Sequence, residues 1–308
     1  MRHHSALSII RRSTGLKSHA LRNWTLLFAL AAMWGSSFMF MKIGVATVPP
    51  ATLVAARLTL GAIILYVAMR MRGLKLPHAN WGAYSALAIL GNALPFLLIT
   101  WGQQYIDSAL SGILISIMPL ATMVLAHFYV KGEHLTRVRA LGFAVGFGGI
   151  IVLMGPTAMT GLGNQALAEL AVLGGALCYA GNSVLARRTV SGDFLIASTA
   201  VLIVASAVML PLALVFDQPW RVSPSVGSLS AVIWLGVGPT ALATILYFQL
   251  IAAAGPTFMA MVNYLSPVVA LFAGVFLMGE HPGATAFSGL SLILLGIAIS
   301  RRSPRVVA

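Results

Sequence analysis

Charged residues are scarce in this chain. Only 8% of its 308 residues are Asp, Glu, Lys or Arg, whereas 59% are hydrophobic. A soluble globular protein carries about 25% charged residues, so the composition excludes a water-soluble domain with an ordinary surface. Apolar blocks of about 20 residues, the length of a membrane span, recur along the chain. They lack the apolar–polar alternation of a β-barrel strand. The sequence therefore predicts an all-α polytopic membrane protein.

Acidic residues and cysteine are rarer still. The six Asp and Glu residues are scattered, without the close pair that a metal site needs, and the single cysteine, Cys178, can form no internal disulfide. The sequence contains no glycine-rich phosphate loop that ends in Gly-Lys-Ser or Gly-Lys-Thr, which excludes an ATPase of that type. We therefore predict no metal, no cofactor and no catalytic residues.

Basic residues are more numerous but dispersed. The net charge is +13, yet Lys and Arg lie in short connectors, so no folded basic domain is available for nucleic acid. Proline and glycine at these connectors divide the chain into ten expected transmembrane helices. They cover roughly residues 24–46, 51–70, 79–101, 107–130, 138–155, 167–187, 195–216, 226–252, 256–278 and 284–300.

The basic residues also predict an orientation. With ten spans, sixteen of the 19 Lys and Arg residues fall on one side of the membrane, and only Arg221 falls on the other. The side of the membrane with the excess of Lys and Arg is the cytoplasmic side. The protein is therefore expected in the inner membrane, with both termini in the cytoplasm. Residues 1–23 lack the apolar core of a signal peptide and are predicted to form a basic, disordered or surface-lying cytoplasmic tail. Residues 303–308 are predicted to form a cytoplasmic C-terminal tail.

The chain repeats itself. Gly132-Glu133-His134 recurs as Gly279-Glu280-His281, 147 residues later, and two glycines that follow recur at the same offset. The repeats are predicted to occupy residues 24–155 and 156–302, with five spans each. Because five is odd, the second copy must be inverted in the membrane, which is a recurrent transporter architecture.

These motifs carry a family resemblance. The pattern Trp34-Gly35-Ser36-Ser37-Phe38, followed by Lys42, Pro50 and Arg57, resembles the first repeat of the EamA-type transporters of the drug/metabolite transporter superfamily. The segments Pro119 to Gly142 and Pro267 to Gly289 resemble the ends of its two repeats.

The resemblance covers residues 24–302 and implies a ten-helix secondary transporter, often an exporter of amino acids or related small metabolites, without naming one substrate. The second copy departs from the pattern, because Tyr179 stands where Trp34 would and no Lys–Arg pair recurs.

Lys42 and Arg57 are cations within predicted membrane spans. Such side chains are costly in the bilayer and face protein, a partner or a water-filled cavity. They could snorkel or form a structural pair, for example with Asp107, or they could attract a carboxylate of the substrate, for which the planar fork of Arg57 is suited. The residues alone leave both alternatives open.

Aromatic and polar residues within the spans are the other candidate site residues. Buried amides must face protein or water, which leaves interhelical bonds and ligand contacts equally open. The full set of candidate substrate-binding residues is Trp34, Ser37, Phe38, Lys42, Arg57, Asn92, Trp101, Tyr247, Asn263 and Tyr264. Glu133 and Glu280 are expected instead to cap the helix that follows each of them and to pair with a nearby arginine such as Arg137.

The favoured function is a secondary transporter that exports amino acids or related metabolites by alternating access. One alternative is a membrane-embedded enzyme acting on a lipid or prenyl substrate, but such enzymes need clustered carboxylates or histidines, which the chain lacks. The other alternative is a transporter of sugars or drugs. The expected partners are a small-molecule substrate and the lipid bilayer, without nucleic acid, and the protein is expected to be a monomer or homodimer.

Overall fold

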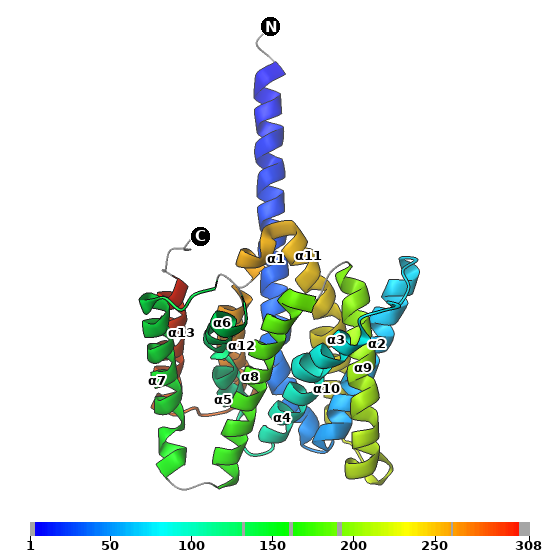
Figure 1. Cartoon of the computed structure of the whole chain (residues 1–308), viewed down its shortest axis with the longest axis vertical. Helices are drawn as coiled ribbons and strands as arrows, with labels where there is room; N and C mark the ends of the chain where they lie inside the picture. Colours follow the sequence, from blue (N-terminus) through cyan, green and yellow to red (C-terminus); the bar gives the residue numbers. More distant parts are fainter. Residues whose placement is uncertain (1–3, 131–132, 160–162, 190–192, 260, 302–308) are drawn as a thin grey trace.

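The computed structural model describes residues 4–130, 133–159, 163–189, 193–259 and 261–301, and these ranges contain helices and turns but no strand. The first half comprises α1 (His4–Val45), α2 (Pro50–Met71), α3 (Trp81–Ala88), the π-helix η1 (Ile89–Ala93), α4 (Leu94–Gly102), α5 (Ser108–Ile115), α6 (Met118–Tyr129) and α7 (Arg137–Met159) (Figure 1). The second comprises α8 (Asn164–Thr189), α9 (Phe194–Leu212), the π-helix η2 (Ala213–Asp217), the 3-10 helix η3 (Pro219–Arg221), α10 (Val226–Leu235), the π-helix η4 (Gly236–Leu242), α11 (Ala243–Met259), α12 (Val262–Phe272), the π-helix η5 (Ala273–Leu277) and α13 (Ala284–Arg301).

The all-helical prediction is confirmed. Within the described ranges, 8 helical runs are long and apolar enough to cross a membrane, and shorter apolar helices cover Val262–Leu277 and Ala284–Ser300. One segment differs from the expectation. The structure continues α1 through residues 4–23, for which the sequence predicted a disordered or surface-lying tail, and this part projects beyond the bundle (Figure 1).

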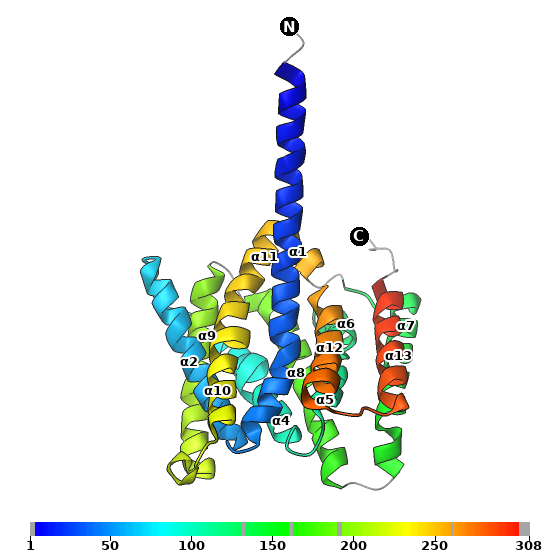
Figure 2. The same ribbon diagram turned by 180° about the vertical axis from the view of Figure 1, so that it is seen from behind.

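Two helix pairs flank a central group of helices. At one flank α2 packs along α9, and at the other α7 packs along α13, while α1, α4, α8 and α12 lie between the flanks (Figures 1 and 2). Helix α1 crosses the middle of the bundle and contacts α5, α10, α11 and α12. Elements from both halves of the chain therefore enclose the centre.

Irregular turns interrupt the central helices. Pro119 lies just after the break between α5 and α6, and Pro239 lies within η4. The π-helices η1 and η4 occupy corresponding places, since Ile89 and Gly236, their first residues, are 147 positions apart. A π-helical turn widens the helix, and such turns are frequent at functional sites.

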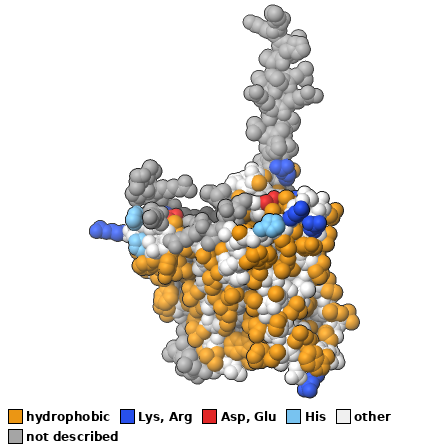
Figure 3. Space-filling view, turned by 45° about the vertical axis from the view of Figure 1, so that its right-hand side comes forward, with side chains coloured by type: hydrophobic (Ala, Val, Ile, Leu, Met, Phe, Trp, Pro, Cys, Tyr) orange, Lys and Arg blue, Asp and Glu red, His pale blue; other side chains and the backbone are white. Residues whose placement is uncertain are grey.

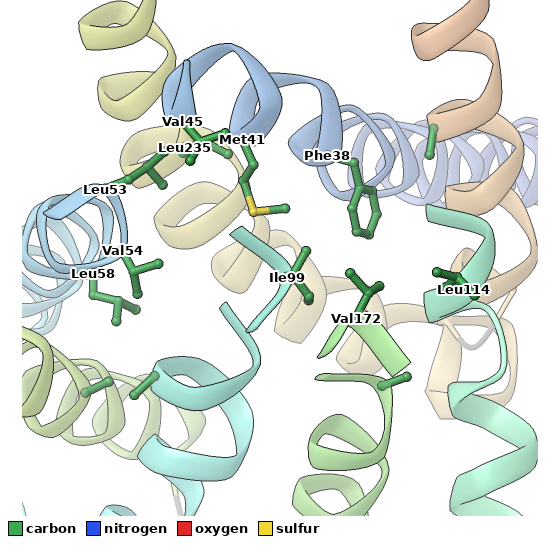
Figure 4. Packing of buried hydrophobic residues seen from close by; sticks show 14 of the residues in the cluster. Phe38, Met41, Val45, Leu53, Val54, Leu58, Ile99, Leu114, Val172 and Leu235 are labelled. Carbon is green, nitrogen blue, oxygen red and sulfur yellow. The ribbon is translucent and has the colours of Figure 1, made fainter. Parts of the chain in front are cut away.

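Buried apolar side chains hold the centre together. Phe38, Met41 and Val45 of α1 meet residues of α2, α4, α5, α8 and α10 in one cluster (Figure 4). The outer surface is also apolar. Hydrophobic side chains cover most of the face in Figure 3, and Lys, Arg and His side chains gather mainly at one end of it. An apolar exterior of this extent requires lipid rather than water around it.

Glycines set the packing of α7 against α13. A Cβ atom added to Gly149 would lie 2.7 Å from the carbonyl oxygen of Gly289, and Gly142 meets the backbone of Gly296 in the same way. Small residues allow helix backbones to approach closely in membranes. Because residue numbers rise along α7 as they fall along α13, the two helices run antiparallel.

We expect Gly149→Leu to destabilise the protein, because the new side chain must push α13 away from α7. Overpacking of this kind costs about 1–3 kcal/mol. Gly148→Leu is the matched control, since no atom lies within 4 Å of a Cβ built on Gly148. Thermal unfolding of the detergent-purified variants measures the difference, and equal melting temperatures for the two variants would contradict this account of the packing.

Candidate functional site

Arg57 is a cation buried inside the bundle. It is on α2 and is only 2% exposed. Its Nε and Nη2 atoms donate hydrogen bonds to the hydroxyl oxygen of Thr240 in η4, at 3.2 and 3.1 Å. The Thr240 hydroxyl in turn donates to the carbonyl oxygen of Leu235, five residues earlier. The π-helix therefore presents to Arg57 a hydroxyl that is already fixed in orientation.

Two aromatic rings complete the surroundings of this guanidinium. The Arg57 Cζ atom lies 3.9 Å from the centre of the Phe96 ring, a cation–π contact worth about 2 kcal/mol where water is excluded. The Tyr179 ring lies 6.4 Å from the Phe96 ring at 72°. Phe96 comes from the first half of the chain and Tyr179 from the second.

The positive charge of Arg57 is not neutralised by an acidic residue. Among the described residues the structure contains one ion pair, between Arg139 and Glu133. The Nη1 atom of Arg57 is buried and has no hydrogen-bond partner. A buried, uncompensated charge costs several kcal/mol, which makes Arg57 a candidate for contact with an anionic group.

Trp34 and Arg57 converge on the same turn of η4. The Trp34 Nε1 atom donates to the carbonyl oxygen of Pro239 at 3.2 Å, next to Thr240 in sequence. The Trp34 ring also lies 5.8 Å from that of Tyr247 on α11. Helices α1 and α2 of the first half thus both bind this π-helix of the second half.

Lys42 has a different environment. Its Nζ atom donates to the carbonyl oxygens of Gln103 and Ile106, at 2.9 and 2.8 Å. These carbonyls follow the end of α4, where helix carbonyls need donors and a positive charge is favourable. In the structure Lys42 therefore contacts backbone carbonyl oxygens. From the sequence, an ion pair with Asp107 was one of the possibilities.

Glu280 caps the start of α5. Its Oε1 atom accepts hydrogen bonds from the Ser108 N–H at 2.8 Å and the Ser108 hydroxyl at 2.7 Å, and its Oε2 atom accepts from the Ala109 N–H at 2.9 Å. The sequence predicted a cap on the helix that follows Glu280. The cap instead serves a helix of the other half, because the fold brings these distant segments together.

The expected pairing of Glu133 with a nearby arginine is confirmed. Arg139 donates to the Glu133 carboxylate at 3.1 Å, whereas Arg137 was the example given. Arg139 lies closer to the turn that precedes α7 and also donates to the carbonyl oxygen of His134. Nearby, the Nδ1 atom of His127 accepts from the Leu135 N–H, which gives this histidine a packing role.

A pocket lies between the broken helix α5–α6 and α12. Phe38 of α1 and Asn263 of α12 both line it, so the structure brings two of the predicted residues together here. Ser37, one position before Phe38, is buried and donates its hydroxyl to the Trp34 carbonyl within α1. Its hydrogen bond is structural.

The remaining predicted residues lie elsewhere. Asn92 lies in η1, and Trp101 lies at the end of α4 with its ring 5.3 Å from that of Tyr105. Tyr264 packs against the hydrophobic core. Sequence reasoning did not place Phe96 or Tyr179 in the site. The sequence contained one signal that could have identified Tyr179, because this residue occupies in the second repeat the position that Trp34 occupies in the first.

The model of the EamA-like transporter family matches residues 23–155 and, a second time, residues 166–302. The chain belongs to the EamA-like transporter family. The resemblance seen in the sequence is thereby confirmed, and this EamA-like chain contains the family domain twice. Its function is that of a transmembrane transporter.

Curated relatives of this EamA-like transporter have matching lengths. The uncharacterized inner membrane transporter YedA of Escherichia coli K12 is 25% identical over 275 residues, which cover 89% of this chain and 88% of the relative. A probable terminal-alkyne amino-acid exporter of Streptantibioticus cattleyicolor is 26% identical over 282 residues, which cover 91% and 93%. A solved crystal structure, 20% identical, has the same fold with a TM-score of 0.66 and covers 91% of this chain and 97% of its own.

Proposed function

We propose that this protein exports amino acids or related carboxylate-bearing metabolites across the inner membrane by alternating access. Arg57 carries the proposal. It is a buried cation without an acidic partner, and it is enclosed by residues from both halves of the chain. A guanidinium can bind a carboxylate through two parallel hydrogen bonds, and its unpartnered Nη1 atom is available for one of them.

Alternating access follows from the arrangement of the halves as two inverted five-helix repeats. The antiparallel run of α7 and α13, whose glycines correspond at an offset of 147, supports this inversion. So does the pairing of the π-helices η1 and η4. In this arrangement rocking of one repeat against the other exposes the same site to each side of the membrane in turn.

The orientation and the direction of transport are part of the same proposal. Helix α1 begins and α13 ends on the same side of the bundle (Figure 1), and the predicted connectors of that side hold most of the basic residues, which favours a cytoplasmic location for both termini. Export of amino acids is supported by the relative named as a probable amino-acid exporter.

Uptake into proteoliposomes tests the substrate class. The panel contains labelled amino acids, the matching carboxylic acids without the amino group, the matching amines without the carboxylate, and sugars, each with and without a pH gradient. We expect members with a carboxylate to enter and the amines and sugars to stay outside, relative to protein-free liposomes. Transport of amines or sugars without any carboxylate-bearing compound would overturn the proposal.

A further inference from the structure

The hydrogen bonds of Glu280 join the two halves of the chain at one end of the bundle. The carboxylate links the turn that follows η5, in the second half, to the first turn of α5, in the first half. Beside this contact α5 packs closely against α12, because a Cβ atom added to Gly112 would overlap the Cβ atom of Ala270. In the proposed orientation this end lies on the outer side of the membrane, and the structure is closed there.

The cytoplasmic end is arranged differently. Glu133, the counterpart of Glu280 in the first repeat, pairs with Arg139 of α7, and its side chain is 38% exposed. Helix α6, which ends near Glu133, packs mainly against α7, α8 and α13, whereas α5 also packs against α1, α12 and η5. The ion pair of Glu133 thus lies within its own half of the chain, whereas Glu280 binds across the halves.

The repeat identifies the segment that corresponds to the first turn of α5. At the offset of 148 positions that relates the prolines of the two repeats, Ser108 and Ala109 correspond to Pro256 and Thr257. Gly255, with a φ of 81°, breaks α11 immediately before this pair. A new helical segment therefore begins there, and the first N–H groups of such a segment need acceptors from outside it.

We propose that Glu133 closes the cytoplasmic side by the same kind of bond, and that the two glutamates exchange roles during transport. The inference rests on the proposed function and deepens it, since it assigns residues to the two closed states of alternating access. When the halves rock, the Glu280 bonds break, and the Glu133 carboxylate leaves Arg139 and accepts the N–H of Thr257. Inverted repeats favour this exchange, because a contact that closes one face has an equivalent at the other face.

The two closures differ in strength. Ser108 offers Glu280 both its N–H and its hydroxyl, whereas its counterpart Pro256 has neither group. Among the equivalent donors, only the N–H of Thr257 is left for Glu133. Without substrate, the state that is closed on the outer side is therefore favoured, and this is the arrangement of the structure.

Thiol labelling of Asn263→Cys tests the exchange in membrane vesicles of each orientation, with Cys178 replaced by alanine. Asn263 lines the pocket between α5–α6 and α12. Pro256→Ser restores the missing donors, and hydrogen bonds to a charged group are the stronger ones. We therefore expect the ratio of the labelling rates from the two faces to shift about tenfold or more toward the outer face. In a Glu133→Ala background, the matched control, Pro256→Ser should leave this ratio unchanged.

The failures of the two proposals can be told apart. Labelling of Asn263→Cys from one face only, in every variant and with or without amino acids, contradicts alternating access and thereby the proposed function. Labelling from both faces with a ratio that Pro256→Ser leaves unchanged, or shifts equally with and without Glu133, overturns the exchange alone.

A cross-link provides a second measurement that does not depend on the folding of Pro256→Ser. Glu133→Cys combined with Thr257→Cys, again without Cys178, should form a disulfide on oxidation in membranes, since the closed cytoplasmic side brings the two positions together. A disulfide requires Cα atoms within about 7 Å of each other. Absence of the cross-link in a protein whose Asn263→Cys variant is labelled from both faces would also overturn the exchange.

Discussion

Arg57→Leu is expected to abolish transport while the folded protein remains at least as stable as the wild type. The loss follows from the removal of the carboxylate contact. Truncation of one partner of a buried, hydrogen-bonded charge pair costs about 2–5 kcal/mol, which corresponds to a fall in kcat/KM of about 30-fold to several thousand-fold. Uptake of labelled amino acids by proteoliposomes with equal protein content measures it.

The expected stability separates a binding role from a structural one. In the ligand-free protein Arg57 is a buried charge without a carboxylate, and replacement of buried charges by apolar residues is often neutral or stabilising by about 1–4 kcal/mol. Thr240 keeps its hydrogen bond to Leu235 in the variant. A large drop in melting temperature would mean that Arg57 holds the fold together, and the binding role would then lose its support.

Lys42→Met is the matched control, because Lys42 is the other cation within the predicted spans. Its ammonium group donates to two carbonyl oxygens beyond α4, and these lose their donor in the variant. We therefore expect the opposite pattern, with a lower melting temperature and transport reduced only in proportion to the folded fraction. Arg57→Lys should transport at an intermediate rate, since it keeps the charge but not the two-pronged geometry.

The helices of this fold could be predicted from the sequence because their signals are local. Apolar runs of sufficient length, and breaks at proline and glycine, predicted an all-helical chain, and 8 helical runs of the described residues are long and apolar enough to cross a membrane. Because charged residues are scarce in the chain, Lys42 and Arg57 could be recognised from the sequence as unusual residues within the predicted spans. The repeat was also legible, since identical short motifs return at a constant offset.

The contacts of these residues could not be predicted in the same way. Thr240, the partner of Arg57, lies 183 positions away in sequence, and nothing in an apolar helix shows which face meets which neighbour. The π-helix η4 turns the Thr240 hydroxyl toward Arg57, and π-helices have no sequence pattern that would have revealed it. Lys42 was difficult for another reason, because its partners are backbone carbonyls, which every residue possesses.

Glu280→Ala is expected to cause a larger loss of stability than other single changes at helix ends. Ser108 and Ala109 are fully buried, and Glu280 accepts hydrogen bonds from both of their N–H groups and from the Ser108 hydroxyl. A buried donor without a partner costs about 1–3 kcal/mol, so the variant should lose several kcal/mol in the free energy of unfolding. Asp193→Ala is the control, because Asp193 is an exposed residue that accepts one bond from Leu195 at the start of α9, and its loss should cost about 1 kcal/mol.

Thermal or denaturant unfolding in detergent should rank Glu280→Ala below Glu280→Gln and both below the wild type, because glutamine keeps one acceptor oxygen but loses the charge. Equal stability of the alanine variants at positions 280 and 193 would contradict the capping role.

The hydrogen bonds of Glu280 also have a consequence for transport, since they join the second half of the chain to α5 of the first. If the halves rock apart on this side of the membrane, the bond must break in each cycle, and Glu280→Gln should then raise the accessibility of Asn263→Cys to a thiol reagent added from that side. Accessibility equal to that of Asn263→Cys alone would show that α5 and Glu280 move as one body.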